Sequence, residues 1–224
     1  MHPSNARPNI VLPTDTYASE SNSGNDSDRP WFCHGLDCPR YSVVDSCDAY
    51  ETREYEEGVW ATTSIEAYNY AMAVSIGFRR LFKYIDGANE DDVKIPMTAP
   101  VLADVTPSCG PFCKQTFNVS FFVPFHMQES PPTPRDKDIE VTCSPAFTAY
   151  VASAGGYKLD EFSLSKMAGE LADALDADDK KFISDHFFIA GYDPPFRVTG
   201  RHTEVWFLAD EDGGRDNVVV ADSK

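Results

Sequence analysis

A proline-containing run in the middle of the chain most constrains the fold. It reads Lys94-Ile95-Pro96-Met97-Thr98-Ala99-Pro100-Val101. Two prolines four residues apart can lie neither inside a helix nor inside a central strand, because each removes a backbone donor and restricts the backbone angles. Apolar residues fill the positions between the prolines, which is atypical of a solvated loop. The run therefore predicts a connector that packs against a hydrophobic core.

The charge balance argues against several classes of partner. The 224 residues carry 36 acidic side chains against 19 basic ones, a formal net charge of −17. Such a surface repels nucleic acids and anionic membranes, although the same charge can serve solubility alone. No apolar run approaches the ~20 residues that a helix needs to cross a bilayer. We expect a monomer with no nucleic-acid partner and no membrane span.

The cysteines favour disulfides over a metal site. No Cys-x-x-Cys pair occurs and the five histidines show no metal-ligand spacing, so no metal is predicted. An even cysteine count fits disulfides in an oxidising compartment, whereas six reduced thiols would fit the cytosol. We expect a secreted glycoprotein whose signal peptide has been removed, with Asn25 and Asn118 as candidate glycosylation sites. The cysteines are Cys33, Cys38, Cys47, Cys109, Cys113 and Cys143.

Composition divides the chain into one domain and two tails. Residues 1–30 are rich in Ser, Asn, Asp and Pro and predict a disordered tail. Residues 210–224 predict a flexible acidic tail. Residues 31–209 are long enough and apolar enough for a single globular domain.

The first half of the domain predicts three short strands and a long helix. The strands are expected over residues 41–44, 50–55 and 59–62. Thr63-Ser64-Ile65-Glu66 has the form of a capping box, and Asp86-Gly87 predicts the end of the helix. Apolar residues between these signals trace one helical face: Ala67, Tyr70, Ala71, Val74, Phe78, Leu81, Phe82 and Ile85.

The second half repeats this pattern. Strands are expected over residues 139–143, 147–153, 185–191 and 203–208, with a helix over 162–175 and a linking strand over 117–123. The halves align when Cys47 is matched to Cys143, so we prefer a disulfide between these two among the 15 possible pairings. Two helices and about eight strands in duplicated halves predict an α+β domain whose sheets wrap into a barrel-like core with both helices outside.

No strong catalytic motif is present. The chain lacks the nucleophile elbow, the phosphate-binding loop, the paired-histidine helix and the dinucleotide fingerprint. Aromatic side chains are abundant around the first helix, and they serve either core packing or a cleft for a flat apolar ligand. Arg79, Arg80 and Lys83 on that helix could pair with ligand carboxylates.

Several motifs, in order, resemble the SOUL, or heme-binding-protein, family over about residues 38–208. With its cysteines, the chain resembles extracellular animal members of the heme-binding-protein-2 type more than cytosolic members. The matching segments are the run 94–101, Gly110-Pro111-Phe112, Phe122-Val123-Pro124, Pro131-Pro132-Thr133-Pro134, Gly191-Tyr192-Asp193-Pro194-Pro195-Phe196 and Glu204-Val205-Trp206.

The resemblance implies a distorted β-barrel with two helices and a shallow cleft beside the first helix for heme or another tetrapyrrole. The proposed axial histidine of one branch falls on Glu54 here, and a carboxylate is a poorer heme ligand than imidazole. We therefore expect non-covalent binding without histidine ligation. The residues expected to line the cleft are Ser75, Phe78, Arg79, Phe82, Lys83 and Phe121.

Two other functions remain open at this stage. One is a cofactor-independent enzyme that uses the same cleft for a small hydrophobic substrate. Its candidate acid–base residues are Glu54, Tyr157, His186 and Tyr192, a dispersed set that leaves no local motif. The other is an interaction module, for which the net charge is the only indication. The physiological ligand does not follow from the sequence.

Overall fold

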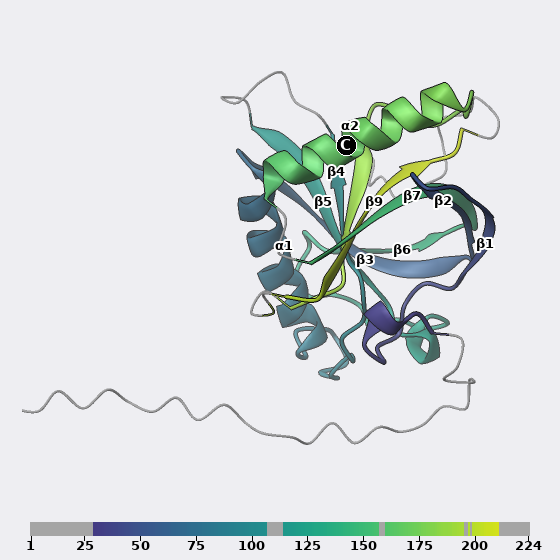
Figure 1. Cartoon of the computed structure of the whole chain (residues 1–224). Helices are drawn as coiled ribbons and strands as arrows, with labels where there is room; N and C mark the ends of the chain where they lie inside the picture. Colours follow the sequence, from purple (N-terminus) through teal and green to yellow (C-terminus); the bar gives the residue numbers. More distant parts are fainter. Residues whose placement is uncertain (1–28, 107–113, 157–159, 195–196, 198, 211–224) are drawn as a thin grey trace, which may run out of the picture.

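The computed structural model describes residues 29–106, 114–156, 160–194, 197 and 199–210. Within them the chain forms one curled antiparallel sheet, a half-barrel, with two long helices, α1 (Tyr70–Ile85) and α2 (Glu161–Ala177) (Figure 1). The α+β class and the distorted barrel are confirmed. The strands are β1 (Tyr41–Ser46), β2 (Glu51–Tyr55), β3 (Gly58–Ala67), β4 (Val101–Val105), β5 (Gln115–Phe122), β6 (Glu140–Ser144), β7 (Phe147–Gly156), β8 (Phe187–Gly191) and β9 (Arg201–Leu208).

The sheet order displays the internal duplication. The nine strands run β1-β2-β7-β9-β8-β4-β5-β3-β6. Exchanging β2 with β6, β3 with β7, β4 with β8 and β5 with β9 turns the order from β2 to β6 into its own reverse. Helix α1 follows β3 and α2 follows β7, so the helices exchange as well. The alignment predicted from Cys47 and Cys143 matched β2 with β7. In the structure β2 is equivalent to β6, and the strand equivalent to β7 is β3.

Alternation along the strands gives the sheet two apolar faces. On β9, Val205 and Phe207 pack in the same cluster as Leu171 of α2, so they face the helices. Trp206 and Leu208 alternate with them and pack in a second cluster inside the curl of the sheet. The half-barrel is therefore filled on its inner side by its own side chains and covered on its outer side by α1 and α2.

Helix α1 begins later than predicted. Its N-cap is Asn69, whose side-chain oxygen accepts a hydrogen bond from the Met72 amide at 2.8 Å. The predicted capping box at Thr63 and Glu66 is wrong, because β3 continues to Ala67. Pairing with β5 along the whole of β3 overrides the local helix signal.

The buried face of α1 also differs from the predicted one. Leu81 and Ile85 are buried as expected, but Ala71 and Phe82 are exposed. The helix approaches the sheet through its small residues, because a Cβ added at Gly77 would lie 2.7 Å from Val119 of β5. The buried face of α1 is therefore rotated from the predicted face toward Ala73 and Gly77. The Phe78 and Phe82 rings lie outside it, half-buried and exposed. The buried residues of α1 are Ala73, Gly77, Leu81, Tyr84 and Ile85.

The proline-containing connector packs against the core, as predicted. Ile95, Thr98 and Ala99 are buried, and the peptide bond before Pro100 is cis. The Thr98 hydroxyl donates to the Phe122 carbonyl at 2.6 Å. The connector ends directly in β4, a strand that the sequence pattern did not indicate.

The disulfide found in the structure joins Cys33 to Cys38. The preferred pairing of Cys47 with Cys143 is wrong, because both are free and exposed. Cys143 lies inside β6, the equivalent of β2, whereas Cys47 precedes β2, so the two cysteines are not equivalent positions. Cys109, Cys113, Asn25 and most of the two predicted tails lie outside the described residues.

Candidate functional site

Five residues of α1 form an exposed stripe on the face away from the sheet. Four of them follow one another at intervals of three or four positions and the fifth, Lys83, lies four positions after Arg79, so all five share one side of the helix. Phe82 is 47% exposed and Met72 46% exposed, which is unusual for large apolar side chains. We call this surface the α1 stripe: Met72, Ser75, Arg79, Phe82 and Lys83. Four of the predicted site residues therefore share one surface.

The other two predicted residues support the stripe from beneath. The Phe78 ring lies nearly parallel to that of Phe82, with 5.8 Å between the ring centroids. The Phe78 ring also lies at a steep angle, 66°, to the ring of buried Phe121 of β5, with 5.3 Å between the centroids. These rings contact one another while Phe82 keeps one face toward solvent. The α1 stripe is therefore an open apolar surface on a rigid aromatic base.

The charges on α1 are all positive. The helix contains three bases and no acidic residue, in a chain of net charge −17. Arg80 is paired, because its guanidinium lies 3.2 Å from Asp138 and donates to the Thr63 hydroxyl at 2.8 Å. Among the described residues, no acidic group forms an ion pair with Arg79 or Lys83. These two cations are available to an anionic ligand.

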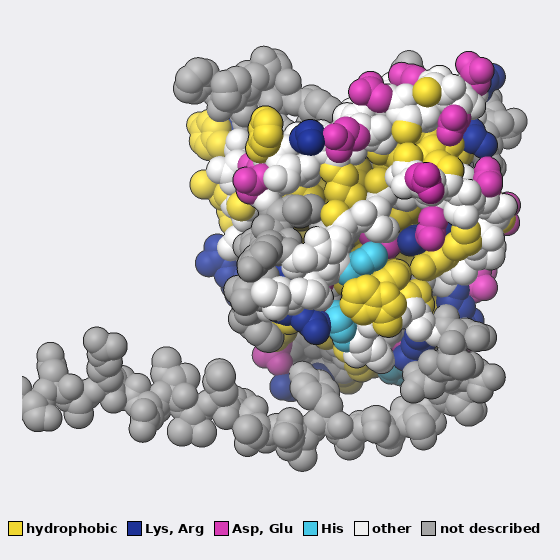
Figure 2. Space-filling view, in the orientation of Figure 1, with side chains coloured by type: hydrophobic (Ala, Val, Ile, Leu, Met, Phe, Trp, Pro, Cys, Tyr) yellow, Lys and Arg dark blue, Asp and Glu magenta, His cyan; other side chains and the backbone are white. Residues whose placement is uncertain are grey.

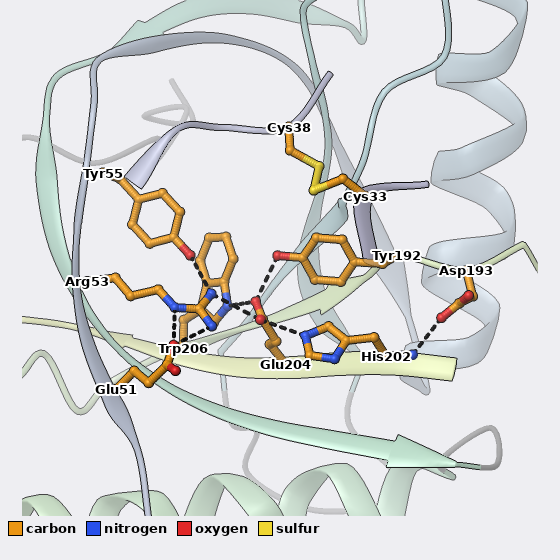
Figure 3. Close-up of polar contacts among 10 residues, drawn as sticks. All are labelled: Cys33, Cys38, Glu51, Arg53, Tyr55, Tyr192, Asp193, His202, Glu204 and Trp206. Atoms are coloured by element: carbon orange, nitrogen blue, oxygen red, sulfur yellow. Dashed lines mark hydrogen bonds and ion pairs between the residues drawn. A yellow bond between two sulfur atoms is a disulfide. The ribbon is translucent and has the colours of Figure 1, made fainter. Parts of the chain in front are cut away.

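A second polar cluster lies inside the half-barrel, and the sequence analysis missed its two central residues (Figure 3). Glu204 of β9 is 0% exposed, and Arg53 of β2 is also buried. The Glu204 carboxylate lies 3.0 Å from the Arg53 guanidinium and accepts from His202 at 2.8 Å. Its other oxygen accepts from the Tyr192 hydroxyl at 2.7 Å and from the Trp206 indole at 2.9 Å.

The pKa values in this cluster are shifted by burial and by neighbouring charge. Burial opposes the charged form of Glu204, but the hydrogen bond from His202 and the charge of Arg53 hold its pKa below the ordinary value. Burial, followed by the Glu204 charge, raises the pKa of Tyr192 well above its ordinary value. Glu204 is therefore a carboxylate, and Tyr192 keeps its proton and donates a hydrogen bond to the carboxylate.

The N-terminal segment closes this cluster from solvent. Phe32 stacks on the His202 ring, with 3.9 Å between centroids and 8° between planes. The Cys33–Cys38 disulfide belongs, with Phe32 and Tyr192, to the hydrophobic cluster inside the curl of the sheet. It lies above Tyr192 in Figure 3. Because four donors satisfy the carboxylate and no solvent reaches it, the arrangement holds strands together and leaves no reacting group free.

The four residues considered for acid–base chemistry do not converge. Tyr192 belongs to the buried cluster, whereas Glu54 is exposed on β2, a strand that pairs with β1 and β7. His186 contacts Asp185 at 2.7 Å outside both sites. Tyr157 lies outside the described residues. The described positions therefore form no shared acid–base site.

The groups on the α1 stripe could hold a heme by apolar contact and by charge pairing. The α1 stripe offers an aromatic face and two cations, which match the flat macrocycle and the carboxylates of heme. No histidine occurs on α1, and Glu54 lies on a strand that α1 does not pack against. No group of three or more potential metal ligands occurs within the described part of the chain. None of the helices there is long and apolar enough to cross a membrane.

Solved structures share the fold at low sequence identity. The C-terminal domain of EcmrR matches 76% of this chain and 98% of its own length, with a TM-score of 0.54 and 13% identity. An EcmrR–DNA complex matches 71% of this chain and 57% of its own, with a TM-score of 0.53 and 12% identity. At such identities the likeness concerns the fold alone.

Sequence relatives are much closer. Heme-binding protein 2 of Homo sapiens is 33% identical over 169 residues, covering 75% of this chain and 82% of the relative. Heme-binding protein 1 of Xenopus laevis is 33% identical over 160 residues, covering 71% and 83%. The model of the SOUL heme-binding protein family matches residues 36–208, nearly the whole described domain. The chain belongs to the SOUL heme-binding protein family.

Proposed function

We propose that the chain binds heme or a related tetrapyrrole on the α1 stripe, without an axial histidine. The observation that carries the proposal is the charge contrast of α1. A helix with no acidic residue, on a protein of net charge −17, presents a half-exposed Phe82 beside Arg79 and Lys83, which form no ion pair with any acidic group in the described ranges. The names of the relatives, heme-binding proteins 1 and 2, support this class of ligand.

The expected binding mode divides between the two kinds of group. The macrocycle covers Phe82 and Met72, and each Å² of apolar surface removed from water contributes about 25 cal/mol before the cost of association. The propionates pair with Arg79 and Lys83, and Arg79 is positioned by its hydrogen bond to the Ser75 carbonyl at 3.1 Å. A dissociation constant in the micromolar range, about 8 kcal/mol of binding free energy, is a reasonable expectation.

The test is a hemin titration followed by the Soret band and by quenching of tryptophan fluorescence. Phe82→Ala is expected to weaken binding at least tenfold. The matched control is Phe162→Ala on α2, because Phe162 is also an exposed helical phenylalanine, 79% exposed. This control should bind hemin as the parent chain does. Absence of a saturable Soret change at tens of micromolar hemin would end the proposal, and equal losses in both variants would remove α1 from it.

The mode of ligation has its own test. Without a histidine ligand, the bound iron keeps a position open to added imidazole. Imidazole is therefore expected to shift the Soret band of the complex saturably. A complex whose spectrum is already that of histidine-ligated iron, and does not respond, would contradict this part.

A further inference from the structure

A cavity of about 520 Å³ lies on the other helix, between α2 and β7. Its floor is apolar, with Ala152 of β7 and with Met167 and Leu171 of α2, and Phe162 lies at its rim. Figure 2 shows hydrophobic side chains exposed along the border of α2 with the sheet. The volume falls within the range of small-molecule sites in proteins.

The duplication explains why this space is open. Counted from the first residues of the equivalent strands β3 and β7, Thr63 corresponds to Ala152. Aligning the buried faces of the helices, Gly77 with Ala168 and Tyr84 with Leu175, places Leu171 where α1 has Arg80. The residues two positions before β6 and β2 are Asp138 and Ala49.

In the first half these three positions are joined by polar contacts. Arg80 donates to the Thr63 hydroxyl at 2.8 Å and lies 3.2 Å from the Asp138 carboxylate. In the second half all three equivalents are short apolar residues that line the cavity: Ala49, Ala152 and Leu171. The cavity therefore lies at the positions equivalent to those that the polar triad holds in the first half.

The charges at the mouth select the kind of ligand. Lys166 and Glu170 line the cavity and form an ion pair with each other at 3.2 Å. They leave no unpaired charge for an ionic ligand, in contrast to Arg79 and Lys83 on the α1 stripe. The mouth therefore carries no net charge, so a charged ligand would lose hydration there without gaining a net opposite charge, a cost that an uncharged molecule avoids.

We infer that the cavity between α2 and β7 is a second binding site, for an uncharged, flat apolar molecule. The aromatic body contacts Met167, Leu171 and Ala152, and Phe162 covers its outer face by ring contact. A hydroxyl or carbonyl on the ligand meets Ser163 and the ion pair at the mouth. The site differs from the α1 stripe in place and in the charge of its ligand.

Methionine methyl NMR of the full chain separates the two sites, because Met167 lines the cavity and Met72 lies on the α1 stripe. The probes share one ring system and differ in charge: 1-pyrenemethanol, 1-pyrenecarboxylate and 1-pyrenemethylammonium. We expect 1-pyrenemethanol to shift the Met167 signal saturably and to leave Met72 unchanged. The two charged probes should bind at least fivefold more weakly by pyrene fluorescence.

Two surface variants test the cavity without threatening the core. Ala49→Phe fills the mouth from an exposed position, and Phe162→Ala removes the outer ring. Each should weaken 1-pyrenemethanol at least fivefold while hemin titrations stay unchanged, and Phe82→Ala should do the reverse.

The opposite results have definite meanings. A Met167 signal that does not move, or an affinity that Ala49→Phe leaves intact, overturns the site. Equal affinity for the charged probes overturns the ligand class. Failure of hemin binding alone bears only on the α1 stripe.

Discussion

At the scale of single residues, two buried carboxylates behave in opposite ways. Glu204 accepts hydrogen bonds from four partners, and these lower its pKa despite burial. Asp104 of β4 is 5% exposed, and its Oδ1 has no hydrogen-bond partner. Burial raises the pKa of Asp104, and the charge of His186 and the Asn118 amide only partly oppose the shift. The difference lies in the number of donors, because a carboxylate without them is costly to bury.

Glu204→Gln is expected to destabilise the fold by about 1–3 kcal/mol at pH 7, because it removes one of the two carboxylates that pair with buried Arg53, leaving only Glu51 at 2.8 Å. Since the folded pKa is lowered, this contribution is present above the ordinary value of 4.5 and is lost as the pH falls through the folded pKa. Urea unfolding at pH 7 and pH 3 measures the difference, which should shrink at pH 3. Glu54→Gln on the exposed side of β2 is the control and should be nearly neutral.

Asp104→Asn is expected to stabilise the fold by about 1 kcal/mol at pH 7, because it removes a buried charge whose hydrogen-bond donor is the Asn118 amide at 3.3 Å and whose Oδ1 has none. Here the folded pKa is raised, so the parent chain loses stability as the pH rises from 3.8 through the folded value. The variant should therefore gain over the parent at pH 7 and match it near pH 3. A variant that is less stable than the parent at pH 7 would show that the charge is satisfied.

Peptide mapping without reduction tests the cysteines. We expect Cys33 and Cys38 in one linked fragment, because the structure joins them. Cys47 and Cys143 are exposed and should react with iodoacetamide in the folded chain. A fragment that links Cys47 to Cys143 would contradict the structure. An intact Cys33–Cys38 bond in protein from its natural source supports our proposal of an oxidising compartment.

At the scale of helices and strands, local pattern predicted the elements better than their ends. The helix predicted over residues 162–175 is observed over Glu161–Ala177, close to its predicted ends. It begins there because the Asp160 carboxylate caps it, accepting a hydrogen bond from the Ser163 amide at 2.7 Å. For α1 the same kind of signal failed, because Thr63 and Glu66 lie in a strand whose partner β5 begins about fifty residues later. A cap is decided locally, whereas strand pairing is decided by distant residues.

Asn69→Ala is expected to cost about 1 kcal/mol, because Asn69 satisfies the Met72 amide at the start of α1. Glu66→Ala, at the other candidate cap, should cost little, because Glu66 is an exposed strand residue. Thermal unfolding of the two variants compares them directly. A larger loss in Glu66→Ala would restore the capping box at Thr63.

The site shows the same division between local and distant information. Most residues of the α1 stripe are expected from the family resemblance, whereas the apolar spacing alone places Phe82 on the buried face of the helix. The Glu204 cluster could not be predicted, because Arg53 lies 151 positions away in sequence and in a strand whose alternation is weak. A charged residue beside Val205 and Trp206 in an apolar strand was the available signal. The cavity exists because the second half lacks the polar triad of the first half. That difference becomes visible only when the two halves are compared.

At the scale of the whole molecule, net charge and local charge act in opposite directions on an anionic porphyrin. The chain carries −17, whereas α1 carries only bases. If it binds the α1 stripe as proposed, a porphyrin dianion should be repelled at long range and attracted on contact. Salt shortens the screening length from about 30 Å at 10 mM to about 8 Å at 150 mM, so it weakens the distant repulsion more than the contact.

The association rate constant of mesoporphyrin IX is therefore expected to rise severalfold between 10 and 150 mM salt, while dissociation also becomes somewhat faster. Stopped-flow quenching of tryptophan fluorescence measures both. The dimethyl ester of the porphyrin is the control, because its uncharged side chains should make association nearly independent of salt. An association rate that falls with salt would mean that Arg79 and Lys83 steer the ligand from a distance. The acidic surface would then be too far from α1 to oppose them.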